Sequence, residues 1–187
     1  MEPDRTSPAF SLWITGAPGA GKTTLVAALV PRLRKRGIDP VVLRSEFFRQ
    51  RFSPHPVDAE EEREAFYRGM IEVAAMFVEH GVPVLIDATG MRRSYRTAAR
   101  ECLDGFAEVH VECPPELCAT RHADNASRGA GASLPAGVVE PAARYETPVH
   151  PELVIHSDRE DPESAAARTM DFLISSGRIP SRRQSRV

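Results

Sequence analysis

A glycine-rich segment near the N-terminus has the residue types and spacing of a phosphate-binding loop. Residues 16–23 read Gly-Ala-Pro-Gly-Ala-Gly-Lys-Thr, which matches G-x-x-x-x-G-K-[ST]. Glycines let successive backbone N–H groups turn toward phosphate oxygens, and a helix that follows directs the positive end of its dipole at the same anion. The residues predicted to bind the phosphates are Gly16, Ala17, Pro18, Gly19, Ala20, Gly21, Lys22, Thr23 and Thr24.

Three side chains have the chemistry of phosphoryl transfer. Lys22 would reach the β- and γ-phosphates, and the Thr23 hydroxyl would bind Mg²⁺. Asp87 ends an apolar run and would help to hold the Mg²⁺, or would instead cap the helix that follows. Residues 87–90 also fit the D-x-x-G of GTP-binding switches, but no N-K-x-D sequence follows, so we favour ATP.

A second acid, Glu46, follows the apolar run 40–43. The second strand of a doubly wound sheet ends near the crevice where ligands bind. Glu46 could therefore orient or deprotonate an acceptor hydroxyl, and Arg49, about one helical turn later, could bind an anionic group of the acceptor. The alternative is a solvated helix start with an acid near its N-terminus.

Two arginines precede a stretch rich in glycine, alanine and proline, residues 129–141. Arg121 and Arg128 are seven residues apart and share one face of a predicted helix. We predict a mobile lid at about residues 121–145, whose arginines neutralise charge on the transferring phosphoryl group. The alternative is that both are surface arginines, in a chain with 22 arginines and only two lysines, Lys22 and Lys35.

Elements that position these residues follow from the apolar pattern. Predicted strands cover 10–15, 40–43, 82–87, 107–112 and 153–156. Predicted helices cover 24–36, 58–80, 92–103, 115–127 and 163–174. Five βα units in succession predict an α/β P-loop NTPase fold, nucleotide-kinase-like, with a doubly wound five-stranded parallel sheet flanked by helices.

Length and composition set the limits of the prediction. The 187 residues, 42% hydrophobic and 27% charged, fit one domain, which we place at 9–175 between disordered tails at 1–8 and 176–187. A formal net charge of −2 makes nucleic acid an unfavoured partner, and no apolar run suits a membrane span. Three cysteines without a C-x-x-C pair, and no signal-peptide pattern, favour the cytoplasm.

Several segments together resemble the adenylylsulfate kinase family, which adds a 3′-phosphate to adenosine 5′-phosphosulfate with ATP and Mg²⁺. Residues 13–25 resemble that family's W-[IL]-T-G-x-[SP]-[GA]-x-G-K-[ST]-T-[LI], and residues 44–49 occupy its D-G-D-x-x-R. The other similar segments are Phe52-Ser53, Arg63 and Arg68 with 72–74, 109–121, and 145–148 with 151–153. The resemblance implies that the acceptor is bound by Arg49, Phe52, Arg63, Phe66 and Arg68.

The departures from the family pattern fall on the acceptor side. Arg44 and Glu46 stand at the two aspartates of D-G-D, so that Arg44 reverses a charge. Phe66 replaces the acceptor-binding asparagine, and the lid motif K-G-L-Y is absent. Residues 87–89 also resemble the D-x-T-N of polynucleotide-kinase-type and small-molecule kinases, with Gly90 in place of the asparagine.

The sequence thus predicts an ATP- and Mg²⁺-dependent kinase that phosphorylates a hydroxyl of a small acceptor, nucleotide-like or otherwise anionic. A kinase of sugars, nucleosides or antibiotics is one alternative. A polynucleotide 5′-hydroxyl kinase is another, and it predicts strongly salt-dependent affinity. A nucleotide-binding protein without catalysis is the third. Related kinases are often dimers, so a homodimer is a candidate assembly.

Overall fold

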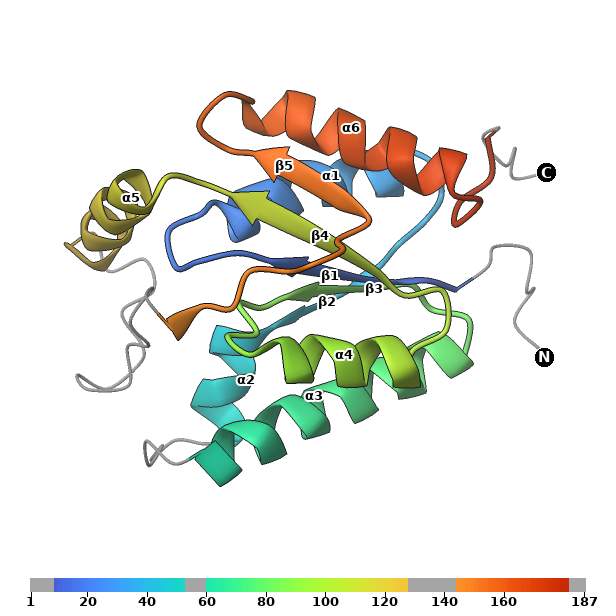
Figure 1. Cartoon of the computed structure of the whole chain (residues 1–187). Coiled ribbons are helices and arrows are strands. Elements are labelled where there is room, and N and C mark those ends of the chain that lie inside the picture. Colours follow the sequence, from blue (N-terminus) through green and yellow to red (C-terminus); the bar gives the residue numbers. More distant parts are fainter. Residues whose placement is uncertain (1–8, 53–59, 128–143, 182–187) are drawn as a thin grey trace.

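The computed structural model describes residues 9–52, 60–127 and 144–181, which form a parallel sheet covered by helices on both faces (Figure 1). Its strands are β1 Ser11–Thr15, β2 Val41–Arg44, β3 Val84–Asp87, β4 Ala107–Glu112 and β5 Leu153–His156. Its helices are α1 Lys22–Arg34, α2 Ser45–Phe52, α3 Glu60–Glu79, α4 Arg93–Cys102, α5 Pro115–Ser127 and α6 Pro162–Ser175. The strand order β2-β3-β1-β4-β5 confirms the predicted doubly wound, five-stranded parallel sheet.

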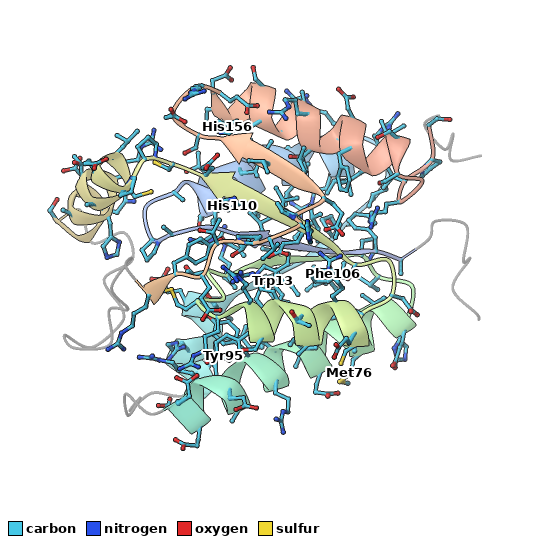
Figure 2. All side chains as sticks on the ribbon, viewed as in Figure 1. Trp13, Met76, Tyr95, Phe106, His110 and His156 are labelled. Atoms are coloured by element: carbon cyan, nitrogen blue, oxygen red, sulfur yellow. The ribbon has the colours of Figure 1, made fainter. Side chains whose placement is uncertain are left out.

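Alternating side chains of the central strand β1 divide the core in two. Leu12 and Ile14 pack with α1 and α6 on one face of the sheet. Trp13 points to the other face and packs with α3 and α4, near Tyr95 (Figure 2). Because both faces are covered, the residues of the central strands are nearly all buried. The carboxyl ends of the parallel strands meet at one edge of the sheet, where the phosphate loop begins.

The boundaries of the elements differ from the predicted ones by at most two residues, and the strands β4 and β5 and the helix α5 coincide with them. Helix α6 begins where it does because Asp161 accepts hydrogen bonds from the backbone N–H groups of Glu163 and Ser164. Helix α2 is not among the helices that the apolar pattern predicts; it follows β2 directly, so that Glu46 lies in its first turn, as the spacing to Arg49 assumes.

The C-terminal end of the domain lies further along the chain than predicted. Ile179 is 2% exposed and packs into the α1/α6 core, while Arg178 donates hydrogen bonds to the carbonyls of Gly105 and Phe106. A tail that begins at residue 176 is therefore wrong, since an apolar residue beyond the last helix is buried. The predicted tail at 1–8 and most of the predicted lid, residues 128–143, lie outside the described residues. No described helix has the length and apolar character to cross a bilayer.

Candidate active site

The phosphate loop connects β1 to α1, and close packing explains its glycines. Gly19 has φ 82°, and a Cβ there would lie 2.1 Å from the carbonyl oxygen of Cys118 in α5. A side chain at this position would therefore collide with helix backbone as well as require a left-handed conformation. Gly21, with φ 101°, precedes α1 as its N-cap residue, so the predicted strand, loop and helix are in place.

Lys22 is the first residue of α1, and its side chain folds back across the loop. Its Nζ donates to the carbonyl oxygens of Gly16 at 2.9 Å and Ala17 at 3.0 Å. Burial lowers the pKa of Lys22 to about 8, although the nearby Asp87 carboxylate opposes that shift. The ammonium is thus poorly hydrated, and phosphate oxygens at the loop would be stronger partners for it than two carbonyls.

This lowered pKa predicts a pH dependence of nucleotide binding. Below pH 8, Lys22 is already charged and affinity should be flat with pH. Above pH 8, binding of phosphates requires uptake of a proton, so the dissociation constant for ADP should rise by up to about tenfold per pH unit. Calorimetry at pH 7, 8 and 9, in buffers of different ionisation enthalpy, measures both the affinity and the proton uptake. The Lys22→Met variant should bind weakly and without this dependence; an equal slope in both proteins would contradict the assignment.

Asp87 ends β3 beside the loop and is 5% exposed. One of its carboxylate oxygens, Oδ2, accepts a hydrogen bond from Thr23 Oγ1 at 2.8 Å. Burial raises the pKa of Asp87, whereas the Thr23 hydrogen bond and the charges of Lys22 and Arg44 act in the opposite direction. The two residues predicted to hold Mg²⁺, Thr23 and Asp87, are therefore brought together.

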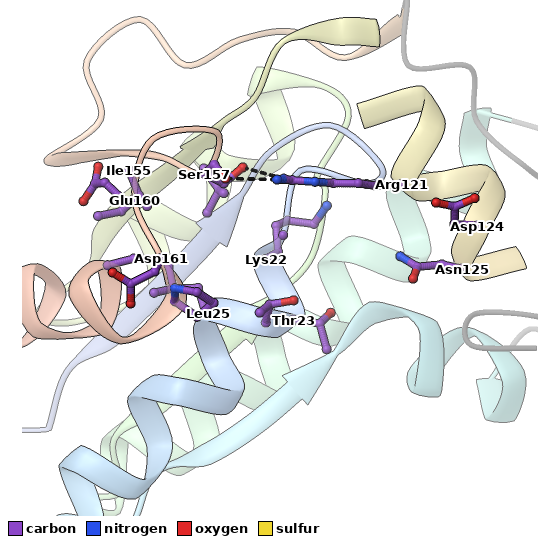
Figure 3. Close-up of a pocket in the computed structure, with 16 residues that line it drawn as sticks. Lys22, Thr23, Leu25, Arg121, Asp124, Asn125, Ile155, Ser157, Glu160 and Asp161 are labelled. Carbon is purple, nitrogen blue, oxygen red and sulfur yellow. Dashed lines mark hydrogen bonds between the residues drawn. The ribbon is translucent and has the colours of Figure 1, made fainter. Parts of the chain in front are cut away.

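A cavity of about 570 Å³ opens from the phosphate loop toward β5 and α6. Arg121 lines it from α5 and donates to the hydroxyl and the carbonyl oxygen of Ser157, both at 3.1 Å. Figure 3 shows Arg121 held in this way next to Lys22. Asp161 and Leu25 line the end of the cavity away from the arginine. The cavity has the size of a ligand site, with a cationic end at the loop.

The predicted acceptor side is built by α2 and α3. Arg49 is 7% exposed, and its guanidinium lies 4.5 Å from the centre of the Phe66 ring. Arg63 is also buried and lies about one turn before Phe66 on α3. The three predicted residues Arg49, Arg63 and Phe66 therefore lie together where α2 packs on α3. Glu46 is exposed in the first turn of α2.

One predicted acceptor residue, Arg68, is not brought to this place. The side chain of Arg68 is 71% exposed and pairs with Glu64 at 3.0 Å, one turn earlier on α3. Arg68 follows the buried Arg63 by five residues, about 140° around the helix axis, so the two occupy different faces. Arg128 and the side chain of Phe52 lie outside the described residues.

Tyr145, the last residue of the predicted lid, and Glu146 directly after it contact the elements next to the site, and the sequence pattern does not predict these contacts. The hydroxyl of Tyr145 lies 3.1 Å from Thr15 Oγ1, which itself donates to the Thr89 carbonyl; Tyr145 is therefore the donor in this pair. The carboxylate of Glu146 accepts the backbone N–H of Arg93 at the start of α4. These contacts join residues more than fifty positions apart, which short sequence patterns do not reveal.

A buried ion pair holds the same region together. Arg96, 3% exposed in its side chain, lies 2.6 Å from Glu108 in β4 and also donates to the carbonyl oxygens of Gly90 and Glu146. Gly90 has φ 55°, and a Cβ there would lie 2.8 Å from the Trp13 ring. This crowding explains why glycine stands where similar kinases have asparagine.

The parallel sheet, the phosphate loop and the carboxylate on the neighbouring strand define a P-loop NTPase fold of the nucleotide-kinase type. The adenylylsulphate kinase family model matches residues 8–156. The chain belongs to this family of alcohol-phosphorylating kinases.

Relatives at the level of sequence cover nearly the whole chain. An adenylyl-sulfate kinase from Paraburkholderia xenovorans is 33% identical over 173 residues, 90% of this chain and 94% of that protein. An adenylyl-sulfate kinase from Shewanella amazonensis is 34% identical over 171 residues, 90% of this chain and 86% of that protein.

Solved structures below 25% identity support the fold alone. The APS kinase of Mycobacterium tuberculosis in complex with AMPPNP and APS has TM-score 0.73 and 24% identity, covering 89% of this chain and 98% of that chain. A sugar kinase from Janibacter sp. has TM-score 0.68 and 21% identity, covering 89% and 95%. The same architecture is therefore used for different acceptors, and the acceptor must be argued from the site.

Proposed function

We propose that the chain transfers the γ-phosphate of ATP to the 3′-hydroxyl of adenylyl sulfate. One observation supports the catalytic part of the proposal. The phosphate loop is complete, and its Thr23 hydroxyl donates a hydrogen bond of 2.8 Å to the buried Asp87 carboxylate. The acceptor is supported by relatives named adenylyl-sulfate kinase that align over about nine-tenths of this chain.

ATP would bind with its phosphates on the loop and its nucleoside in the cavity beyond Arg121. The Thr23 hydroxyl and the Asp87 carboxylate are hard oxygen ligands, which fit Mg²⁺. Among residues 9–52, 60–127 and 144–181, no group of three or more His, Cys, Asp and Glu could hold a metal. Such a sparse set suits Mg²⁺ that is bound mainly through phosphates and water, and the bound ion would supply charge neutralisation at the β- and γ-phosphates.

The chain's own groups would then divide the remaining tasks. Lys22 would hold oxygens of the β- and γ-phosphates, since its ammonium already lies inside the loop. Glu46, exposed at the sheet edge, would orient the acceptor hydroxyl and accept its proton as the oxygen bonds to the γ-phosphorus. Arg121, which is hydrogen-bonded to Ser157, would neutralise negative charge on the phosphates from the side of α5. The proposed lid, with Arg128, would close over them.

The acceptor would occupy the space next to Arg49, Arg63 and Phe66. Two buried guanidinium groups suit an acceptor with anionic groups such as the phosphosulfate of adenylyl sulfate. Phe66 offers an aromatic ring, one face of which is covered by Arg49. We propose no acceptor contact for Arg68, because it pairs with Glu64 on another face of α3.

Replacement of the proposed base gives a direct test. Glu46→Gln keeps the size of the side chain and removes its ability to accept a proton, so kcat should fall by about 10²-fold to 10⁴-fold. The KM for ATP should change little, because Glu46 lies on α2, outside the cavity at the phosphate loop. A coupled ADP-release assay with adenylyl sulfate measures both constants. Turnover within threefold of wild type would show that Glu46 is not the base.

The acceptor itself is tested by the same assay on the unaltered protein. Adenylyl sulfate should support ADP release far better than other nucleotide-linked acceptors, simple sugars or aminoglycoside-type alcohols. Glu79→Gln, at the far end of α3, is a matched control that should leave turnover unchanged. Robust turnover with a sugar and none with adenylyl sulfate would overturn the proposed acceptor and leave the kinase assignment intact.

A further inference from the structure

Arg44 is the last residue of β2, and it lies directly beside the buried acid of the site. The parallel register of β2 and β3 pairs Arg44 with Asp87. The Arg44 Nε atom lies 3.9 Å from Asp87 Oδ2, the same oxygen that accepts the Thr23 hydrogen bond. One carboxylate is therefore flanked by two cations, with Lys22 on the side of the phosphate loop and Arg44 on the side of α2.

Structural stability does not account for an arginine at this place. The Arg44 side chain is 51% exposed, and ion pairs with a partner so exposed contribute little to the free energy of folding. The family pattern that residues 44–49 resemble has an aspartate at this position, so this chain carries a positive group where that pattern has a negative one. Such a reversal changes the local field far more than a neutral replacement would.

We propose that Arg44 is a further catalytic residue, which binds oxygens of the transferring phosphoryl group from the acceptor side. The inference rests on the kinase function proposed above. Two features fit this role: the Arg44 Nε lies within ion-pair distance of the phosphoryl-transfer acid Asp87, and the Arg44 side chain is exposed enough to meet a ligand. Arginine suits the task because its planar fork can donate two hydrogen bonds to one phosphoryl group.

The chemical step places negative charge where Arg44 could act on it. The acceptor oxygen bonds to the γ-phosphorus while the bond from that phosphorus to the β,γ-bridging oxygen breaks, and the hydroxyl proton passes to Glu46. Charge is spread over the three peripheral oxygens of the phosphoryl group during transfer. Lys22 would neutralise this charge from the loop, and Arg44 from the opposite side.

The experiment compares Arg44→Ala, Arg44→Lys and the control Arg51→Ala. Arg51 lies on α2, the helix that directly follows Arg44, and its guanidinium packs on the exposed Phe47 ring, 3.8 Å from the ring centre, so its loss should leave turnover unchanged. Arg44→Ala should lower kcat by about 10²-fold to 10³-fold, with the KM for ATP within threefold. Arg44→Lys should be intermediate, and added guanidinium ion should restore part of the kcat of Arg44→Ala alone.

A binding measurement keeps this inference separate from the proposed acceptor. ADP with Mg²⁺ and aluminium fluoride mimics the transferring phosphoryl group and needs no acceptor. Arg44→Ala should weaken calorimetric binding of that mixture by at least tenfold while binding of Mg²⁺ and ADP alone is kept. The inference is overturned if both affinities match wild type. It is also overturned if Arg44→Ala keeps kcat and needs less Mg²⁺, which would make Arg44 a competitor of the metal for Asp87.

Discussion

The Asp87→Asn variant is expected to lose about 10²-fold to 10³-fold in kcat and to gain or keep thermal stability. Asparagine has nearly the same shape and can still accept the Thr23 hydrogen bond, but it lacks the charge that faces Lys22 and Arg44. Catalysis should suffer because the group proposed to help hold Mg²⁺ is neutralised. The Mg²⁺ concentration for half-maximal turnover should rise together with the fall in kcat.

The stability part of this prediction follows from the direction of the pKa shift. Burial raises the pKa of Asp87 above its ordinary value, so between pH 3.8 and that raised pKa the folded protein binds more protons than the unfolded chain. The contribution of Asp87 to stability is therefore lost as the pH rises through this window, and at neutral pH its buried charge is a cost. Asparagine removes that cost.

Thermal unfolding at pH 7 and at pH 4 measures the difference, and Thr23→Ser, which keeps the hydroxyl, is the matched control. An Asp87→Asn variant with wild-type kcat would contradict the role of Asp87 as a functional acid. A melting temperature well below that of wild type at neutral pH would contradict the expectation that its buried charge lowers stability.

The fold could be predicted because its determinants are local. Short apolar runs with turns between them identify buried strands, and the phosphate loop lies within eight consecutive residues between a strand and a helix. The start of α6 is likewise visible as Asp161 followed by proline. Ile179 was missed because its burial depends on packing between α1 and α6, which no pattern around residue 179 expresses.

The site could be predicted only where its residues are close in sequence or follow strand ends. The proximity of Thr23 and Asp87 could be predicted because the carboxyl ends of neighbouring parallel strands meet at one edge. The spacing of Arg63 and Arg68 already indicates that they lie on different faces of α3, since two residues five positions apart on a helix do not share a face. Ser157, which holds Arg121 from 36 positions away, depends on tertiary packing alone.

Stability should depend most strongly on the buried ion pair between Arg96 and Glu108. Replacement of Arg96 by methionine leaves a Glu108 side chain that is only 9% exposed, with Arg100 3.6 Å away as its remaining charged partner. Breaking a buried pair by removing one partner costs about 3–5 kcal/mol of unfolding free energy. For a chain of this size the melting temperature should fall by about 6–20 °C. Thermal and urea unfolding measure the two quantities.

Two further variants distinguish a buried charge from a general loss of packing. Arg100→Met removes a cation that is 39% exposed from the same cluster and should cost about 1 kcal/mol or less. The double variant Arg96→Met with Glu108→Leu should recover a large part of the loss, because no unpaired charge then remains buried. Recovery of the unfolding free energy would show that the single variant is unstable chiefly because it leaves the Glu108 charge unpaired. The part of the unfolding free energy that is not recovered would be due to the lost hydrogen bonds from Arg96 to Gly90 and Glu146. If Arg96→Met lowered the unfolding free energy no more than Arg100→Met does, the prediction would be wrong. The buried pair would then not be the contact that holds the segment after the proposed lid to the sheet.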